Sequence, residues 1–207
     1  MNIKNIDSTQ ALPVMEQFYT IQGEGRYAGR AAYFIRLAGC DVGCVWCDVK
    51  ESWDQEAHTL IAIETLVASV LASKTDFVVI TGGEPAMYDL TTLVNALHEN
   101  ALEIAIETSG CYPLLGAIDW YCFSPKKFKK ACDEAYQKAS ELKVVIFHPS
   151  DLKWAEEHAT RVKSDCLLYL QTEWSKQEQI LPLIIDYVKE NPKWRVSLQT
   201  HKFMNIP

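Results

Sequence analysis

Short apolar runs rich in β-branched and aromatic residues alternate along this chain with segments of helical periodicity. The predicted strands are residues 14–22, 32–37, 77–81, 103–107, 120–123, 142–147, 167–171 and 194–199. Such alternation indicates a parallel sheet covered by helices. Eight complete β/α units usually need about 250 residues, and this chain has 207. We therefore predict an α/β fold in one domain, residues 1–207, built as an abbreviated, partial (β/α) barrel.

Three segments between the strands have one apolar face at helical spacing. The first contains Ile63, Leu66, Val67, Val70 and Leu71, and the second contains Leu90, Leu93, Val94 and Leu97 after a capping Asp89. In the third, Ser175 and Glu178 form a capping-box pattern. Pro182 lies inside that third segment, so we expect its helix to kink or to begin late.

The charge balance is acidic, with 20 basic and 27 acidic residues and a formal net charge of −7. This composition argues against broad binding to nucleic acid or to an anionic membrane. No apolar run approaches the roughly 20 residues of a membrane helix, and the first residues lack the apolar core of a secretory signal. We expect a cytoplasmic protein.

Seven cysteines are present, and Cys40, Cys44 and Cys47 lie within eight residues as a C-x3-C-x2-C run. An odd number of clustered thiols in a chain of this size is not the pattern of a disulfide framework. Thiolates are soft ligands that favour zinc or iron–sulfur clusters. Structural zinc sites and ferredoxin-type clusters both normally have four protein ligands. Three thiolates therefore suggest a cluster with one iron open to an exogenous ligand, although a zinc knuckle or unligated cysteines remain the alternatives.

This cysteine run follows an early predicted strand, and Thr81-Gly82-Gly83-Glu84-Pro85 ends a later one. Together they resemble the radical S-adenosylmethionine (SAM) superfamily. The resemblance extends over nearly the whole chain to the 7-carboxy-7-deazaguanine synthase family. Its matching segments include 18–25, 34–37, 106–110, 124–126, 141–145 and the tail from Trp194 to Pro207. The Gln-Gly-Glu-Gly segment and the tail are its most specific parts.

The resemblance implies a radical SAM lyase with a [4Fe–4S] cluster, in the biosynthesis of queuosine and other 7-deazapurines. The reduced cluster would cleave SAM to a 5′-deoxyadenosyl radical that abstracts hydrogen from C6 of 6-carboxy-5,6,7,8-tetrahydropterin. Ring contraction and loss of ammonia would then give 7-carboxy-7-deazaguanine, with SAM regenerated. The family also implies an electron donor such as flavodoxin and a homodimer.

The resemblance also assigns site residues. Cys40, Cys44 and Cys47 would ligate the cluster. Contacts to SAM would come from Gly83, Ser124, Pro125, Lys126, Gln171, Thr172, Glu173 and Trp174, with Gly82 and Glu84 as weaker candidates. Contacts to the pterin would come from Ile21, Gln22, Gly23, Arg36, Thr81 and the carboxylate of Pro207, with Glu24 and His201 as weaker candidates. A salt bridge is the alternative role for Arg36, and a frayed terminus is the alternative for Pro207.

The chain departs from the family pattern at Val49. The family typically has Thr or Ser at this position, where the hydroxyl helps to coordinate Mg²⁺, and valine has no side-chain oxygen. We expect Mg²⁺ to stimulate the enzyme's turnover only weakly, and we name no ligand for it. The competing hypotheses for the chain are another small radical SAM protein, such as a glycyl-radical activase, and a zinc-stabilised interaction module.

Overall fold

The computed structural model describes residue 7 and residues 9–207, which build a mixed β-sheet. Its strands are β1 (Ala11–Ile21), β2 (Ala31–Leu37), β3 (Thr59–Ala62), β4 (Phe77–Gly82), β5 (Glu103–Thr108), β6 (Trp120–Phe123), β7 (Glu141–Ile146), β8 (Leu167–Thr172) and β9 (Trp194–Ser197). Their spatial order is β3-β1-β2-β4-β5-β6-β7-β8-β9. All neighbours from β2 to β9 are parallel, whereas β1 is antiparallel to β2 and to β3. The sheet is open, with β3 and β9 at its edges, so the expected partial barrel is confirmed.

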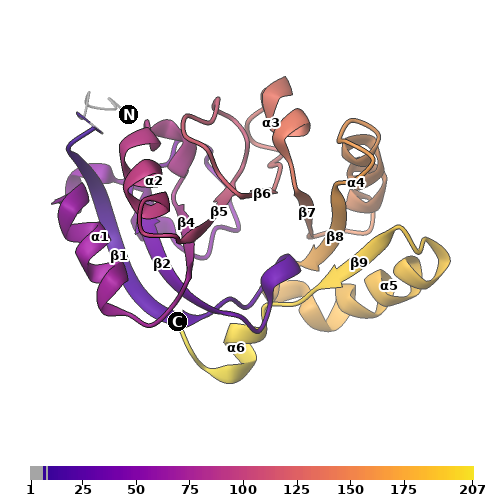
Figure 1. The fold of residues 1–207 in the computed structure, drawn as a ribbon. Helices are drawn as coiled ribbons and strands as arrows, with labels where there is room; N and C mark the ends of the chain where they lie inside the picture. Colours follow the sequence, from indigo (N-terminus) through magenta and orange to yellow (C-terminus); the bar gives the residue numbers. More distant parts are fainter. Residues whose placement is uncertain (1–6, 8) are drawn as a thin grey trace.

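The helices follow the strands in chain order. They are α1 (Ile63–Ala72), α2 (Thr91–His98), α3 (Asp133–Lys138), α4 (Asp151–Ala159), α5 (Gln177–Glu190) and α6 (Thr200–Met204). Figure 1 shows α1 to α5 around the outside of the curved sheet, in the same order as the strands. The short α6 and the C-terminus lie apart from them, near β1 and β2. No helix in the described part of the chain is long and apolar enough to cross a membrane.

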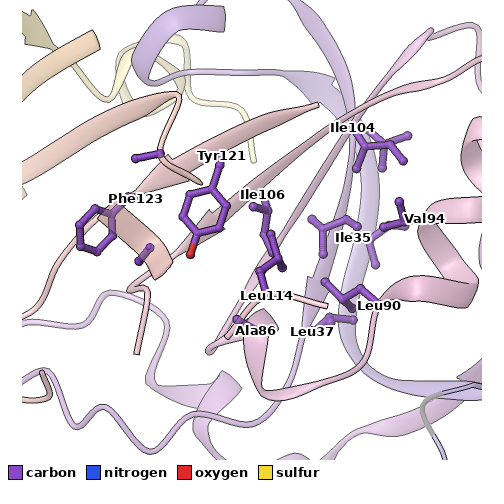
Figure 2. Close-up of a cluster of buried hydrophobic side chains, with 14 of the residues drawn as sticks. Ile35, Leu37, Ala86, Leu90, Val94, Ile104, Ile106, Leu114, Tyr121 and Phe123 are labelled. Carbon is purple, nitrogen blue, oxygen red and sulfur yellow. The ribbon is translucent and has the colours of Figure 1, made fainter. Parts of the chain in front are cut away.

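The main core lies between the sheet and the outer helices. The apolar face formed by Leu93, Val94 and Leu97 of α2, together with its N-cap residue Leu90, is completely buried. Figure 2 shows Leu90 and Val94 beside strand residues such as Ile35. Each such side chain stabilises the fold by about 1.5–3 kcal/mol when removed from water. The N-cap residue of this helix is Leu90, which has no side-chain cap. The expected capping residue Asp89 lies one position earlier, and its carboxylate accepts a hydrogen bond of 2.9 Å from the backbone N–H of Thr91.

Three local expectations differ from the structure. The short strand β3 was not expected, because its four residues carry almost no buried face. Ser175 does not cap α5: it lies in the 3₁₀ turn Trp174–Lys176, and its hydroxyl donates to the Glu173 carboxylate at 2.5 Å. The helix α5 begins at Gln177 and continues through Pro182. The expectation that this helix begins late was therefore wrong.

The parallel register of β2 and β4 prepares the site. Arg36 on β2 is the register partner of Thr81 on β4, and Leu37 is the partner of Gly82. Since parallel strands end at the same edge of a sheet, the segment after β2 and the segment after β4 emerge side by side. The cysteine run and the glycine-rich strand end are thereby neighbours.

Candidate active site

A cavity of about 270 Å³ opens at the carboxyl ends of the parallel strands. It brings together residues from both halves of the chain. From the expected cluster and SAM positions, it is lined by Cys40, Cys44, Cys47, Gly82, Gly83, Glu84, Ser124, Lys126, Gln171, Thr172, Glu173 and Trp174. From the expected substrate positions, it is lined by Ile21, Gln22, Gly23, Glu24, Arg36, Thr81, His201 and Pro207. Pro125 does not line it and faces a second cavity instead.

The cysteine loop is held at both ends by backbone hydrogen bonds. The N–H of Gly39 donates to the Ser52 carbonyl at 2.6 Å, and the N–H of Cys40 donates to the Trp53 carbonyl at 3.2 Å. Within the loop, the N–H of Cys47 donates to the Cys44 carbonyl at 3.1 Å. The loop therefore has a fixed path that turns all three cysteines toward one cavity.

The environment of the thiols is apolar. Burial raises the pKa of the Cys40 and Cys44 thiols to about 11. Such thiols become thiolates when a bound metal displaces their protons. In the described part of the chain, no group of three or more His, Cys, Asp or Glu side chains is arranged to hold a metal ion. Three soft donors along one cavity wall fit an iron–sulfur cluster, whose cysteine ligands bind different irons.

The glycine-rich end of β4 is packed against the cysteine loop. A Cβ on Gly82 would lie 2.1 Å from the Leu37 carbonyl oxygen, and one on Gly83 would lie 2.3 Å from the Gly39 carbonyl oxygen. Both close approaches involve backbone, which cannot rotate away as a side chain can. The N–H of Gly83 donates to the Leu37 carbonyl at 2.9 Å. This strand end therefore requires glycine, as expected from its sequence.

Glu84 continues this strand end but points into the protein. Its carboxylate is buried and accepts hydrogen bonds from four donors: the N–H and the hydroxyl of Ser109, the hydroxyl of Thr108 and the N–H of Ala86. All four donors are protein groups, so the carboxylate holds the end of β4 against the end of β5. Glu84 thus positions the neighbouring glycines.

The floor of the cavity is a buried charged network that sequence reasoning missed. Lys143 is 3 % exposed at its side chain and forms ion pairs with Glu24 at 2.5 Å and Glu107 at 2.6 Å. The amide of Gln22 donates to Glu107 at 3.3 Å, and that of Gln199 donates to Glu24 at 2.9 Å. Burial alone lowers the pKa of Lys143, but the surrounding negative groups more than offset it and hold the pKa well above its usual value. Lys143 is thus a buried cation.

Glu24 is held ionised within this network. Its burial raises the pKa, but Lys143 and the amide donors outweigh that effect and bring the pKa down to about 2. The positions of Lys143 and Glu107 could have been noticed in the sequence, since charges inside otherwise apolar strands are rarely buried without a partner. The strand pattern alone did not indicate that they meet.

Arg36 has two environments at once. It lines the cavity next to its register partner Thr81, and its Nε donates to the Glu16 carboxylate at 2.6 Å. The salt bridge that the sequence left open is therefore present. Among the described residues the guanidinium has no other hydrogen-bond partner, so its remaining N–H groups are open to a ligand.

The segments expected to contact SAM lie directly after β6 and at the end of β8. Lys126 donates from Nζ to the carbonyl of Ser124 at 2.9 Å and to its hydroxyl at 2.6 Å. Gln171, at the end of β8, accepts a hydrogen bond of 2.7 Å from the Ser197 hydroxyl. The Glu173 side chain is used locally, because it accepts from the N–H of Ser175 at 3.1 Å.

The C-terminal tail folds back over the mouth of the cavity. The N–H of Thr200 donates to the Gly23 carbonyl at 3.0 Å, and His201 packs so closely that a Cβ on Gly23 would lie 2.2 Å from its Nδ1. A C-terminal oxygen of Pro207 accepts a hydrogen bond of 3.4 Å from the Thr20 hydroxyl. Pro207 therefore lies beside β1. Val49 also lines the cavity and offers no side-chain oxygen there.

Comparison with known proteins agrees with this arrangement. Residues 34–121 match the model of the radical SAM superfamily. A 7-carboxy-7-deazaguanine synthase of Flavobacterium psychrophilum is 53% identical over 98% of this chain and 96% of its own length. The enzyme of the same name from Synechocystis is 44% identical over 96% of this chain and 95% of its own. The crystal structure of QueE from Escherichia coli has a TM-score of 0.83 at 30% identity, covering 91% of this chain and 94% of that one. The chain therefore belongs to the 7-carboxy-7-deazaguanine synthase family of the radical SAM superfamily.

Proposed function

We propose that this chain converts 6-carboxy-5,6,7,8-tetrahydropterin to 7-carboxy-7-deazaguanine with loss of ammonia, as a radical SAM lyase. One observation carries the proposal: a single cavity holds the cysteine loop, the glycine-rich strand end and a buried network of amides and charges. The names of the relatives support the same reaction. The glycyl-radical activase and the zinc module do not account for the charged floor.

Cys40, Cys44 and Cys47 would hold the [4Fe–4S] cluster, and the Gly83 backbone would contact the amino acid part of SAM. When bound, these two groups supply the one-electron chemistry of the superfamily. The ends of β6 and β8, through Ser124, Lys126 and Gln171 to Trp174, would contact the nucleoside part. The protein's own contribution is to fix the reacting carbon in place and to exclude water.

The cavity floor suits the pterin. Carboxylate and amide side chains such as Glu24 and Gln22 can pair with the donors and acceptors of an aminopyrimidinone edge. A carboxylate on the substrate suits the free N–H groups of Arg36. Ile21, Gly23, Thr81, His201 and the Pro207 carboxylate complete the proposed wall, whose outer part is the folded C-terminal tail.

The other parts of the proposal follow from the family. We include a single domain over residues 1–207, a homodimer, a flavodoxin as electron donor, and Mg²⁺ held by substrate, water or backbone. All seven cysteines are unpaired, which suits a reducing cytoplasm.

The decisive experiment is anaerobic reconstitution with iron, sulfide, reductant, SAM and the carboxypterin, followed by mass spectrometry for the deazaguanine. The triple variant Cys40→Ala/Cys44→Ala/Cys47→Ala should hold no cluster. Cys111→Ala is the matched control, because this half-buried cysteine lies outside the loop. It should keep the cluster, whereas loss of the cluster would mean that a fourth protein ligand fills the open corner. No product from protein with an intact cluster would refute the assignment.

A further inference from the structure

The C-terminal tail is held over the cavity by a few partly exposed contacts. It follows β9 and forms the five-residue helix α6, none of whose residues is buried. The side-chain amide of Gln199, just before α6, donates to Glu24 on the cavity floor at 2.9 Å. The N–H and the hydroxyl of Thr200 both donate to the Gly23 carbonyl at 3.0 Å. The tail therefore begins against the wall that is proposed to contact the pterin.

Two side chains of α6 reach a different wall of the cavity. The Phe203 ring lies with its centroid 5.5 Å from the centroid of the Trp174 ring, at an interplanar angle of 76°. The Lys202 ammonium lies 5.0 Å from the centroid of the same indole, within the range at which a cation is attracted to an aromatic face. Trp174 lines the cavity in the segment after β8 that is proposed to contact SAM. The helix α6 thus contacts the SAM side of the site.

Lys202 also connects the tail to the cysteine loop. Its ammonium donates to the Asp48 carboxylate at 3.0 Å and to the amide oxygen of Gln199 at 3.3 Å. Asp48 comes directly after the third cysteine and lines the cavity. Lys202 and Phe203, here called the tail clip, are not among the described residues that line the cavity. The tail clip therefore acts on the site through the lining residues that it touches.

The tail clip joins two groups of proposed ligand contacts. Bound SAM would hold Trp174 in place. The bound pterin would contact His201 and the carboxylate of Pro207, which precede and follow the tail clip in the chain. A ligand that fixes Trp174 therefore favours the tail position in which His201 and Pro207 face the cavity. Two ligands that favour the same arrangement of a shared element raise each other's affinity.

We propose that Lys202 and Phe203 are positioning residues that couple the binding of SAM to the binding of the pterin. The inference rests on the proposed function, which supplies both ligands. Because α6 has no buried residue, its position over the cavity depends on the tail clip and on the hydrogen bonds of Gln199 and Thr200. Without SAM, the pterin binds only the fraction of molecules in which the tail is in place, and its apparent affinity is lower by that fraction.

The test measures equilibrium binding to the reconstituted protein with its cluster oxidised, a state that gives SAM no electron. Isothermal titration yields the dissociation constant of 6-carboxy-5,6,7,8-tetrahydropterin with and without saturating SAM. In the parent protein, SAM should lower this constant about tenfold, within the usual range for coupled sites. Titration of SAM with and without the pterin must give the same coupling factor, because coupling between two binding equilibria is reciprocal.

Substitutions in the tail clip should remove the coupling. Phe203→Ala and Lys202→Met should each reduce the coupling factor to about twofold, because each removes a contact to Trp174. Phe203→Tyr and Lys202→Arg keep a ring and a cation at these positions and should retain the parent factor. Met204→Ala is the matched control, because Met204 is the next residue of α6 and is 44 % exposed. This control should also retain the parent factor.

The coupling factor distinguishes positioning from a purely structural role. A structural role would weaken pterin binding equally with and without SAM, and an unchanged factor in Phe203→Ala and Lys202→Met would overturn the proposal. An equal loss in Met204→Ala would overturn it as well. If SAM did not affect pterin binding in the parent protein, the coupling would be refuted, and product formation by the same protein after reduction with dithionite would leave the proposed function standing. If the parent protein bound no pterin in any titration, the proposed function would fail together with the coupling.

Discussion

Glu84→Gln isolates the anchor that holds the glycine-rich strand end. The carboxylate accepts two backbone N–H bonds and two hydroxyl bonds in a site that is 1 % exposed. Glutamine has nearly the same shape, but one of its oxygens becomes an NH₂ group. The Ser109 and Thr108 hydroxyls can turn to accept from that group, whereas a backbone N–H cannot. At least one of the N–H groups of Ala86 and Ser109 is then left buried without an acceptor.

The magnitude follows from those bonds. An unsatisfied buried donor costs about 1–3 kcal/mol, and hydrogen bonds to a charged group contribute more than neutral ones. We expect Glu84→Gln to lower the free energy of unfolding by about 2–4 kcal/mol. The free energy of unfolding can be measured by urea denaturation of the cluster-free protein under reducing conditions, with circular dichroism as the signal. We expect the dependence on urea concentration to have the same slope in the variant and the parent protein.

The control applies the same chemical change at an exposed site. Glu99 is exposed at the end of α2, so Glu99→Gln should change the unfolding free energy by less than about 0.5 kcal/mol. The reasoning is refuted if Glu84→Gln is as stable as Glu99→Gln. In that case the four bonds do not anchor the strand end.

Four further predictions concern other parts of the molecule. Gly83→Ala should lose about 1–3 kcal/mol of stability, because the new methyl group meets the Gly39 carbonyl. The variant should also bind SAM more weakly in an equilibrium titration, and normal SAM affinity would contradict this. Burial, aided by Arg161, lowers the pKa of His158 to about 4, so the unfolded chain takes up a proton near pH 6.5 that the folded chain refuses. Stability should therefore fall as pH drops from about 6.5 to 4, and His158→Gln should lack this part of the slope in urea titrations. A peptide tag after Pro207 should reduce turnover far more than the same tag at the N-terminus, and equal turnover would remove the terminus from the site. Mg²⁺ should stimulate turnover only weakly because of Val49, so strong, saturable stimulation abolished by EDTA would disprove that expectation.

Features that depend on local spacing could be predicted from the sequence alone. The C-x3-C-x2-C run fixes three thiols in one short loop whatever surrounds it. The two glycines after β4 were expected to permit close backbone approach, and the Leu37 and Gly39 carbonyls do approach them. The β/α alternation likewise determined a mostly parallel sheet, since parallel neighbours need a crossover between them.

The tertiary structure decided which distant residues meet. Lys143 comes between Glu24 and Glu107 only because β7, β5 and the end of β1 converge on one cavity. The sequence gives no separation in space for residues far apart along the chain, and hydrophobic periodicity does not say which buried charges pair. The four hydrogen bonds that the Glu84 carboxylate accepts likewise depend on the tertiary structure. Local patterns therefore determined the chemistry that the chain can carry, and long-range packing determined where its charges, its C-terminus and its exposed lysines lie around that chemistry.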